Sequence, residues 1–393
     1  MNMDKVVRIS ALTGLGVVVF LLGYTLYYAV FSITKESDLI SYHAPCWGEK
    51  NKIYFIKKVA YGKAIINPSS LLNKILYLEG DYLPEKTEVY VCSMNYDGSN
   101  KKEIVKLCDT EIGNREYGDT KEGSYWLPRY MDWCSANNLL LISGGDIPGR
   151  GETSQGVYTM KINGQDKRRL SETGVHASWS PDGKKIAYEI ITKESRSEKM
   201  YGYKEPVEYY DEENTIWVMN SDGSDKHQIS REKILTRTGR WVRDEQGKPV
   251  MENGKEKYVW KEMYEDTDPI WSPRGDLIAF VCKGWIYTMK PDGSERRKVI
   301  DSSHLAGWTV DGKMLFVGGK EEGGSEHAYN WFVDLNGNIV KKVAYWGKFS
   351  LDGSLLRCTL DIIYNKEGEK LPLKEPFPEK EKYWQYKRPN NIW

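Results

Sequence analysis

The sequence lacks an excess of either charge, because 56 Lys and Arg residues are matched by 56 Asp and Glu residues. A protein that binds nucleic acid needs a cationic surplus to neutralise phosphates, so we expect no nucleic-acid partner. Histidine is also scarce, with five residues in the whole chain. Few imidazole side chains are therefore available for a metal site or a general base.

Motifs that carry catalysis or bind cofactors are missing as well. The sequence has no G-x-S-x-G nucleophile elbow and no H-E-x-x-H zinc motif. Residues 307–314 nearly match a phosphate-binding loop, but Met314 replaces the required Ser or Thr. The six cysteines form no C-x-x-C pair, which argues against zinc; they read as buried apolar residues, and their pairing stays open. We therefore expect no cofactor and no metal.

One long apolar run stands out in an otherwise polar chain. Residues 9–34 contain no charged side chain, which is long enough for a helix that crosses a bilayer. A cleaved signal peptide and a buried core helix are the alternatives, but no convincing cleavage site follows the run. Lys5 and Arg8 precede it, whereas Lys35 is followed by Glu36 and Asp38. The positive-inside rule then predicts a single-pass anchor with a cytoplasmic N-terminus and the remainder of the chain periplasmic or extracellular.

The remainder of the chain is built from two alternating turn signals. The first is Ser-Pro-Asp-Gly at 180–183, with variants at 272–275, 309–312 and 350–353. The second is Asp-Gly or Asn-Gly at 97–98, 163–164, 222–223, 292–293 and 336–337. Short runs of β-branched and aromatic residues flank each signal, and these turns tolerate positive φ, so each predicts a β-hairpin. Two hairpins per repeat make four strands, which is typical of a propeller blade.

These repeats resemble the WD40-like repeats of TolB-type β-propellers over about residues 50–365. The resemblance implies an all-β, six-bladed propeller, with seven blades as the alternative. We expect the strand at 52–56 to complete the last blade. The small α/β domain that precedes the propeller in TolB itself has no counterpart here, which puts a direct role in the Tol system in doubt. The expected organisation is a cytoplasmic stub and anchor (1–34), a linker (35–50), the propeller (51–365) and a proline- and charge-rich tail (366–393).

Long insertions fall between the hairpins or between repeats, and never in the tight turns. In a four-stranded meander both kinds of connection emerge on one face, which marks that face as a binding side or as a site of neutral loop growth. Within the longest insertion, 231–267, two alternating segments predict a protruding hairpin pair that carries Trp241, Tyr258 and Trp260. Exposed aromatic residues are common interface anchors, although these rings could also fold back on the propeller.

The residues just before each first hairpin should line the channel mouth on the same face. Counting back from the turns places Tyr130, His176, Asp268, Leu305 and Trp346 there, with His304 beside Leu305. His176, Asp268 and His304 could converge on a metal or act as a base with its orienting carboxylate, but polar groups are ordinary at a wet channel mouth. We therefore favour a non-catalytic module that binds a protein or an envelope polymer. A glycan lyase or hydrolase with its site in the channel mouth is the alternative.

Overall fold

A computed structural model describes residues 35–36, 39–49, 52–65, 81–111, 128–144, 156–318, 330–343, 348–349, 355–357, 363–365, 370–372 and 374. Every regular element in these ranges is a β-strand, which confirms the all-β class. The apolar run at 9–34 lies outside the described residues. Within the described ranges, no helix has the length and apolarity that a membrane crossing requires.

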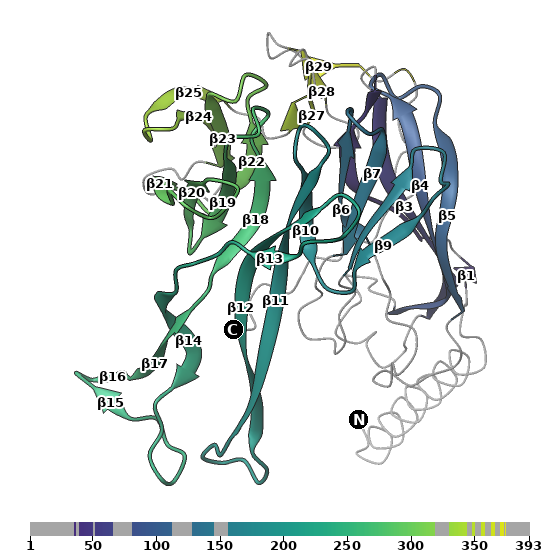
Figure 1. Ribbon diagram of the computed structural model, residues 1–393. Helices are drawn as coiled ribbons and strands as arrows, with labels where there is room; N and C mark the ends of the chain where they lie inside the picture. Colours follow the sequence, from purple (N-terminus) through teal and green to yellow (C-terminus); the bar gives the residue numbers. More distant parts are fainter. Residues whose placement is uncertain are drawn as a thin grey trace, which may run out of the picture.

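The strands form consecutive antiparallel meanders, and the described residues contain six of them with four strands each (Figure 1). Meander 1 comprises β2 (Leu39–Trp47), β3 (Lys52–Ile65), β4 (Asp81–Asn95) and β5 (Lys102–Glu111), with β1 (Lys35–Glu36) added to β3. Meander 2 comprises β6 (Pro128–Cys134), β7 (Leu139–Gly144), β8 (Val157–Lys161) and β9 (Arg168–Ser171). Meander 3 comprises β10 (Val175–Trp179), β11 (Lys185–Glu198), β12 (Val207–Asn220) and β13 (His227–Gln228).

The second half of the chain continues the same pattern. Meander 4 comprises β18 (Asp266–Trp271), β19 (Ile278–Cys282), β20 (Trp285–Met289) and β21 (Arg297–Asp301). Meander 5 comprises β22 (Leu305–Trp308), β23 (Met314–Gly318), β24 (Asn330–Asp334) and β25 (Ile339–Val343). Meander 6 comprises β26 (Lys348–Phe349), β27 (Leu355–Arg357), β28 (Ile363–Asn365) and β29 (Lys370–Leu371).

The strand at 52–56 does not complete the last meander. It belongs to β3, between β2 and β4, and meander 6 is completed by its own strand β29. Strand β2 occupies most of the segment expected to be a linker, and β29 lies in the segment expected to be a tail. The connection between β2 and β3 and the connection between β28 and β29 carry no Asp-Gly or Asn-Gly signal, so the sequence pattern did not indicate β2 or β29.

The Asp-Gly turns owe their shape to local hydrogen bonds. In the turn at 292–293, the Asp292 carboxylate accepts hydrogen bonds from both the backbone N–H and the hydroxyl of Ser294. Gly293 has a φ of 80°, and a Cβ there would overlap the carbonyl oxygen of Ile229 in the preceding meander. Glycine is therefore required twice, for the backbone conformation and for the close approach of the neighbouring meander.

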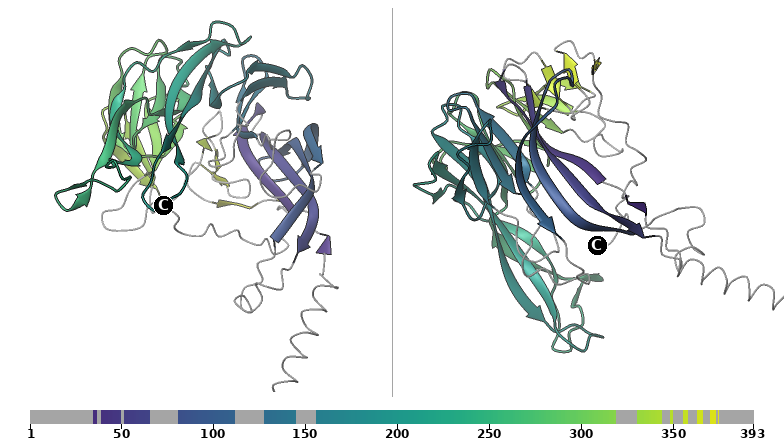
Figure 2. Two further views of the ribbon diagram at one scale, coloured as in Figure 1. Left: turned by 90° about the horizontal axis from the view of Figure 1, so that it is seen from below. Right: turned by 90° about the vertical axis from the view of Figure 1, so that its right-hand side faces the viewer.

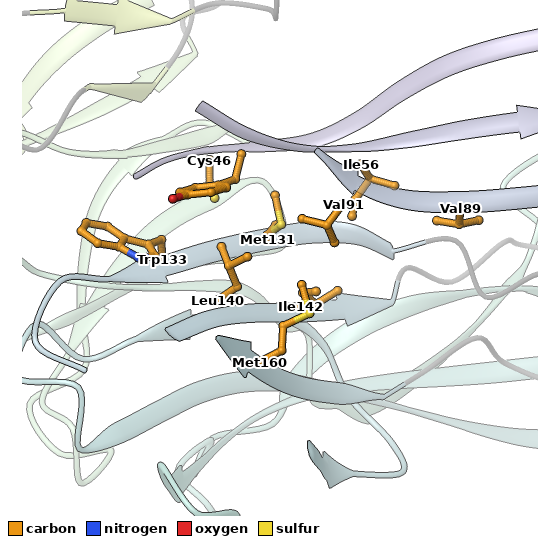
Figure 3. Packing of buried hydrophobic residues seen from close by; sticks show 10 residues of the cluster. Cys46, Ile56, Val89, Val91, Met131, Trp133, Leu140, Ile142 and Met160 are labelled. Atoms are coloured by element: carbon orange, nitrogen blue, oxygen red, sulfur yellow. The ribbon is translucent and has the colours of Figure 1, made fainter. Parts of the chain in front are cut away.

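Apolar cores lie between successive meanders rather than inside any one sheet. Figure 3 shows the core between meanders 1 and 2, where Ile56 and Val91 face Met131, Leu140 and Ile142. Comparable cores join meanders 2 and 3, 3 and 4, and 4 and 5. The first strands also contact one another in chain order, from β2 through β6, β10, β18 and β22 to β26. This stacking of sheets around their first strands is an arrangement of the propeller type, and it curves through space in Figure 2.

The last meander packs against the first. Leu371 of β29 contacts the core of meander 1 that includes Trp47, Ile53 and Phe55. Lys374, just beyond β29, donates its backbone N–H to the carbonyl oxygen of Asp97 at 2.7 Å, and its ammonium lies 2.8 Å from the Asp97 carboxylate. We call this contact between meanders 6 and 1 the seam; Figure 1 shows β27–β29 above the first meander.

Two hairpins project from one side of the molecule (Figure 1). The β11–β12 arm is the part of meander 3 beyond the pair Ile190–Thr215, and its strands stay paired to Glu198–Val207. The insert arm consists of β14 (Ile234–Trp241) and β17 (Tyr258–Met263), with the small hairpin β15 (Met251–Glu252) and β16 (Lys255–Glu256) at its far end. We call the side from which they project the arm face.

Candidate functional site at the base of the arms

A cluster of ionisable side chains lies where the two arms leave the arm face. His176 comes from β10, Glu189 from β11 and Asp268 from β18, so two neighbouring meanders contribute. The His176 Nδ1 atom lies 2.6 Å from Glu189 Oε2 and 2.7 Å from Asp268 Oδ1. The backbone N–H of Asp268 donates to Glu189 Oε2 at 3.1 Å. These contacts hold the three side chains together as one unit, which we call the His176 cluster.

The backbone places His176 and Asp268 at equivalent points of their repeats. Both have positive φ, 49° and 53° respectively, where their strand departs from regular pairing with the next one. Such a bulge turns a side chain away from its usual position on a strand. Two successive repeats therefore direct their bulged residues toward each other, and Glu189, opposite Val175 in the register of β10 and β11, completes the group.

Tyr130 of β6 supports the imidazole from the preceding meander. Its ring meets the His176 ring edge to face, with centroids 3.9 Å apart and an interplanar angle of 81°. Edge-to-face packing of this kind fixes ring orientation. The His176 imidazole is thus held by a ring from meander 2 and by carboxylates from meanders 3 and 4.

Burial and charge oppose each other in this cluster. Burial disfavours the imidazolium, but the hydrogen bonds to Asp268 and Glu189 outweigh it and raise the pKa of His176 well above its usual value of 6.5. The Glu189 side chain is 2% exposed, His176 is 19% exposed and Asp268 is 41% exposed. The cluster is therefore closed on the Glu189 side and open to solvent on the Asp268 side.

The structure brings together three of the five residues expected at the channel mouth, Tyr130, His176 and Asp268. His304 is exposed and contacts the hydroxyl of Ser303 through Nδ1 at 3.0 Å, outside the His176 cluster. In its repeat the strand pairing becomes irregular between Leu305 and Gly307. The position equivalent to His176, counted from the turn, is Leu305, whose side chain is not ionisable. Trp346 lies outside the described residues.

Glu189 was missed by the sequence reasoning. It lies on the second strand of its repeat, and only the cross-strand register with Val175 places it beside His176. A charged residue between the apolar Tyr188 and Ile190, in a strand that is otherwise buried at this point, was the available signal.

A buried ion pair secures β18 two residues before Asp268. Asp266 is fully buried and accepts a hydrogen bond from Arg296 Nη1 at 2.7 Å. The Arg296 guanidinium lies over the rings of Phe280 and Tyr287, at 4.9 and 4.7 Å from their centroids. The pair ties the start of β18 to the segment that leads into β21, and so fixes the strand that carries Asp268.

The three aromatic residues predicted in the insertion have different environments. Trp241 and Tyr258 are opposite each other in β14 and β17, with ring centroids 5.7 Å apart, and both are partly buried. Arg237 lies 4.1 Å from the Tyr258 ring centroid. Trp260 is 56% exposed and points into solvent. The insertion thus keeps two of the rings within the arm and presents the third.

The two arms are braced against each other by charged contacts. Lys261 of β17 lies 2.9 Å from Glu194 and 3.6 Å from the buried Asp211 of the β11–β12 arm. Farther out, the backbone N–H of Tyr201 donates to the carbonyl oxygen of Gly247 at 3.0 Å. The arms therefore form one joined projection, whose exposed large side chains include Tyr201, Tyr203, Tyr210, Met251 and Trp260.

Comparisons with known proteins return likenesses of fold only. No family model matches the chain, and no curated protein matches it. The acylaminoacyl peptidase of Pyrococcus horikoshii is 13% identical with a TM-score of 0.39, over 77% of this chain and 39% of that protein. Dipeptidyl peptidase 4 of Porphyromonas gingivalis is 11% identical with a TM-score of 0.31, over 86% of this chain and 52% of that protein.

A third solved structure, the Dos1 propeller, is 8% identical with a TM-score of 0.39, over 82% of this chain and 92% of its own. This chain spans about two fifths and about half of the two peptidases, respectively. At these identities and TM-scores, the likenesses assign neither a family nor an activity.

Proposed function

We propose that the chain forms a closed, six-bladed β-propeller of the TolB-like type, in which each meander is one blade. The proposal is supported by the cores between successive meanders and by the unbroken chain of contacts between their first strands. The seam supports closure, because Leu371 and Lys374 join the last meander to the first. The repeated turn motifs provide the family resemblance.

The observation that carries the functional proposal is the joined projection on the arm face. It extends beyond the ring, is braced by ionic contacts, and carries exposed Tyr and Trp side chains. Large aromatic side chains supply contact area with little loss of conformational entropy, and they dominate many interfaces. We infer a non-catalytic module that binds a protein or an envelope polymer through the arm face.

The proposed setting is outside the cytoplasm, with residues 9–34 as a single-pass anchor and the N-terminus in the cytoplasm. The anchor would concentrate the ring at a membrane surface, where the arms reach partners in the same envelope. A reporter fused to the C-terminus tests this orientation, since a reporter that is active only outside the cytoplasm should give signal. Signal from a reporter that is active only in the cytoplasm would contradict it.

Site-specific photocrosslinking in the native membrane tests the binding face. A photoreactive residue at Trp260 on the insert arm should give discrete crosslinked products. The same residue at Tyr96, which is exposed on a tight turn at the other end of its meander, is the matched control and should give none. Products from position 96 alone, or equal products from both, would refute binding through the arm face.

Shortening the insert arm provides the second half of the test. Thr236 and Lys261 are paired across β14 and β17, so residues 237–260 can be replaced by an Asn-Gly turn. Lys261 and its contacts to Glu194 and Asp211 are then kept. We expect a crosslinker at Tyr210, on the other arm, to lose its products, and unchanged products would exclude the insert arm from the interface.

A further inference from the structure

We propose that the His176 cluster is a binding site for one divalent transition-metal cation, held by His176 Nδ1 and by the carboxylates of Glu189 and Asp268. The inference concerns the ring alone and does not depend on what the arms bind. The three ligand atoms lie within 4.8 Å of one another. Each comes from a different strand, and the ion would tie meander 3 to meander 4.

His176 Nδ1 has too few hydrogen atoms for the two carboxylate oxygens that it contacts, which favours a metal cation between them. An imidazole Nδ1 carries at most one hydrogen, yet it faces two carboxylate oxygens at 2.6 and 2.7 Å. One hydrogen cannot be aligned with both oxygens, because a hydrogen bond weakens steeply as it bends. A metal ion, by contrast, accepts electron pairs from the nitrogen and from both oxygens at once.

The charges point the same way. With a protonated imidazole, the cluster carries one positive and two negative charges, a sum of −1. With a neutral imidazole and a divalent ion, the sum is zero. Because the Glu189 side chain is 98% removed from solvent, an uncompensated negative charge is costly there, and neutrality favours the ion.

The geometry needs only a small adjustment. Metal bonds of about 2.0–2.2 Å place neighbouring ligand atoms roughly 3–3.5 Å apart, so the carboxylate oxygens would withdraw from Nδ1 by less than about 1 Å. Asp268 is the most exposed of the three side chains, so a small shift of its carboxylate disturbs the least buried surface. One nitrogen and two oxygens suit Mn²⁺ or Zn²⁺ better than Ca²⁺, which prefers six to eight oxygens. Three protein ligands leave positions on the solvent side for water or for a group of a bound partner.

Equilibrium binding of Zn²⁺ and of Mn²⁺ to the detergent-solubilised full chain tests the proposal. After removal of metal with EDTA, one equivalent of at least one ion should bind. Glu189→Gln and Asp268→Asn should each weaken binding about 100-fold or more, since even changes to outer-shell groups cost about 10–100-fold. His176→Asn should do the same, and Asn is suitable at position 176 because it tolerates positive φ.

His304→Asn is the matched control, because His304 is exposed and lies outside the cluster. Its binding should equal that of the native chain, and melting temperatures confirm that each variant is folded. A second readout is the proton that His176 must release when the ion binds, measured as buffer-dependent heat and absent in His176→Asn. If neither ion binds, or if binding persists in the Glu189 and Asp268 variants, the proposal is wrong.

Discussion

His176 carries its charge between two carboxylates that belong to neighbouring repeats. In the metal-free protein, the imidazolium is a link between meanders 3 and 4, formed by Glu189 on one side and Asp268 on the other. The strength of this link depends on pH, because a neutral imidazole has no positive charge to offset the two carboxylates. Stability should therefore follow the protonation of this one residue.

We expect the His176 link to stabilise the metal-free protein at low pH and to be lost as pH rises. The pKa in the folded state is raised above the unfolded value of about 6.5, so the full contribution is present below about pH 6.5. It disappears as the pH passes through the higher folded pKa. The stability difference between the native chain and His176→Asn, in EDTA, should be about 1.5–3 kcal/mol at low pH and should shrink at alkaline pH.

Melting temperatures across the pH range measure this difference. His304→Asn, at an exposed histidine, should follow the native curve at every pH. A stability difference for His176→Asn that grows toward alkaline pH would contradict the proposed sign.

Only some of the residues in and around the His176 cluster could be predicted from the sequence. Tyr130, His176 and Asp268 were found by counting back from the turn signals, because the repeat fixes the distance from turn to bulge. Glu189 depends on the register of β10 and β11, which a single sequence does not reveal. His304 was expected only as the neighbour of Leu305, the residue that the count gives in its repeat, and it lies exposed outside the cluster.

At the scale of the element, β18 depends on a buried charge pair at its start. Asp266 is fully buried, and the Arg296 guanidinium lies over the rings of Phe280 and Tyr287. The pair was not predicted, because neither residue belongs to a turn motif. The turns themselves were predictable, since the Asp-Gly and Ser-Pro-Asp-Gly signals act within four residues.

We expect Arg296→Met to cost about 3–5 kcal/mol, because it leaves the Asp266 carboxylate buried without its cation. The double change Asp266→Leu with Arg296→Met should recover much of this loss, since replacing both members of a buried pair can be close to neutral. Chemical unfolding of the full chain measures both. An equal loss in the single and double variants would mean that packing, and not the charge, is the cause.

Extended strands in the arms were harder to predict than the turns. Residues 192–213 were expected as an insertion, but β11 and β12 stay paired through most of it. These strands carry charged side chains such as Glu194, Arg196 and Asp211, so the apolar alternation that marks a strand is missing. Contacts with the insert arm replace an apolar core there.

At the scale of the molecule, apolar cores between sheets hold successive meanders together, and the seam joins meander 6 to meander 1. Each core is shared by two meanders, so each sheet depends on its neighbours. The all-β class and the repeated hairpins could be predicted because the same signal recurs along the chain. The strands at 39–47 and 370–371 could not, because the connections beside them, 48–51 and 366–369, carry no Asp-Gly or Asn-Gly signal.

The seam should be as sensitive to charge as an interior core. Leu371→Asp places a carboxylate against the side chains of Trp47, Ile53 and Phe55 and should destabilise the protein by about 2 kcal/mol or more. Leu235→Asp is the control, because Leu235 is 58% exposed on the insert arm, and it should have little effect. The melting temperature of Leu371→Asp should be lower than that of Leu235→Asp. Equal melting temperatures would show that meander 6 does not close on meander 1.

The seam also has a consequence for how the protein is made. Chains emerge from the ribosome N-terminus first, so meander 1 is synthesised long before β29. Until Leu371 has been translated, the apolar face of Trp47, Ile53 and Phe55 has no cover from meander 6. In a nascent chain this apolar surface therefore lacks its cover from Leu371 until β29 has been synthesised. A chaperone that shields meander 1 would act from the time meander 1 leaves the ribosome until β29 has folded onto it.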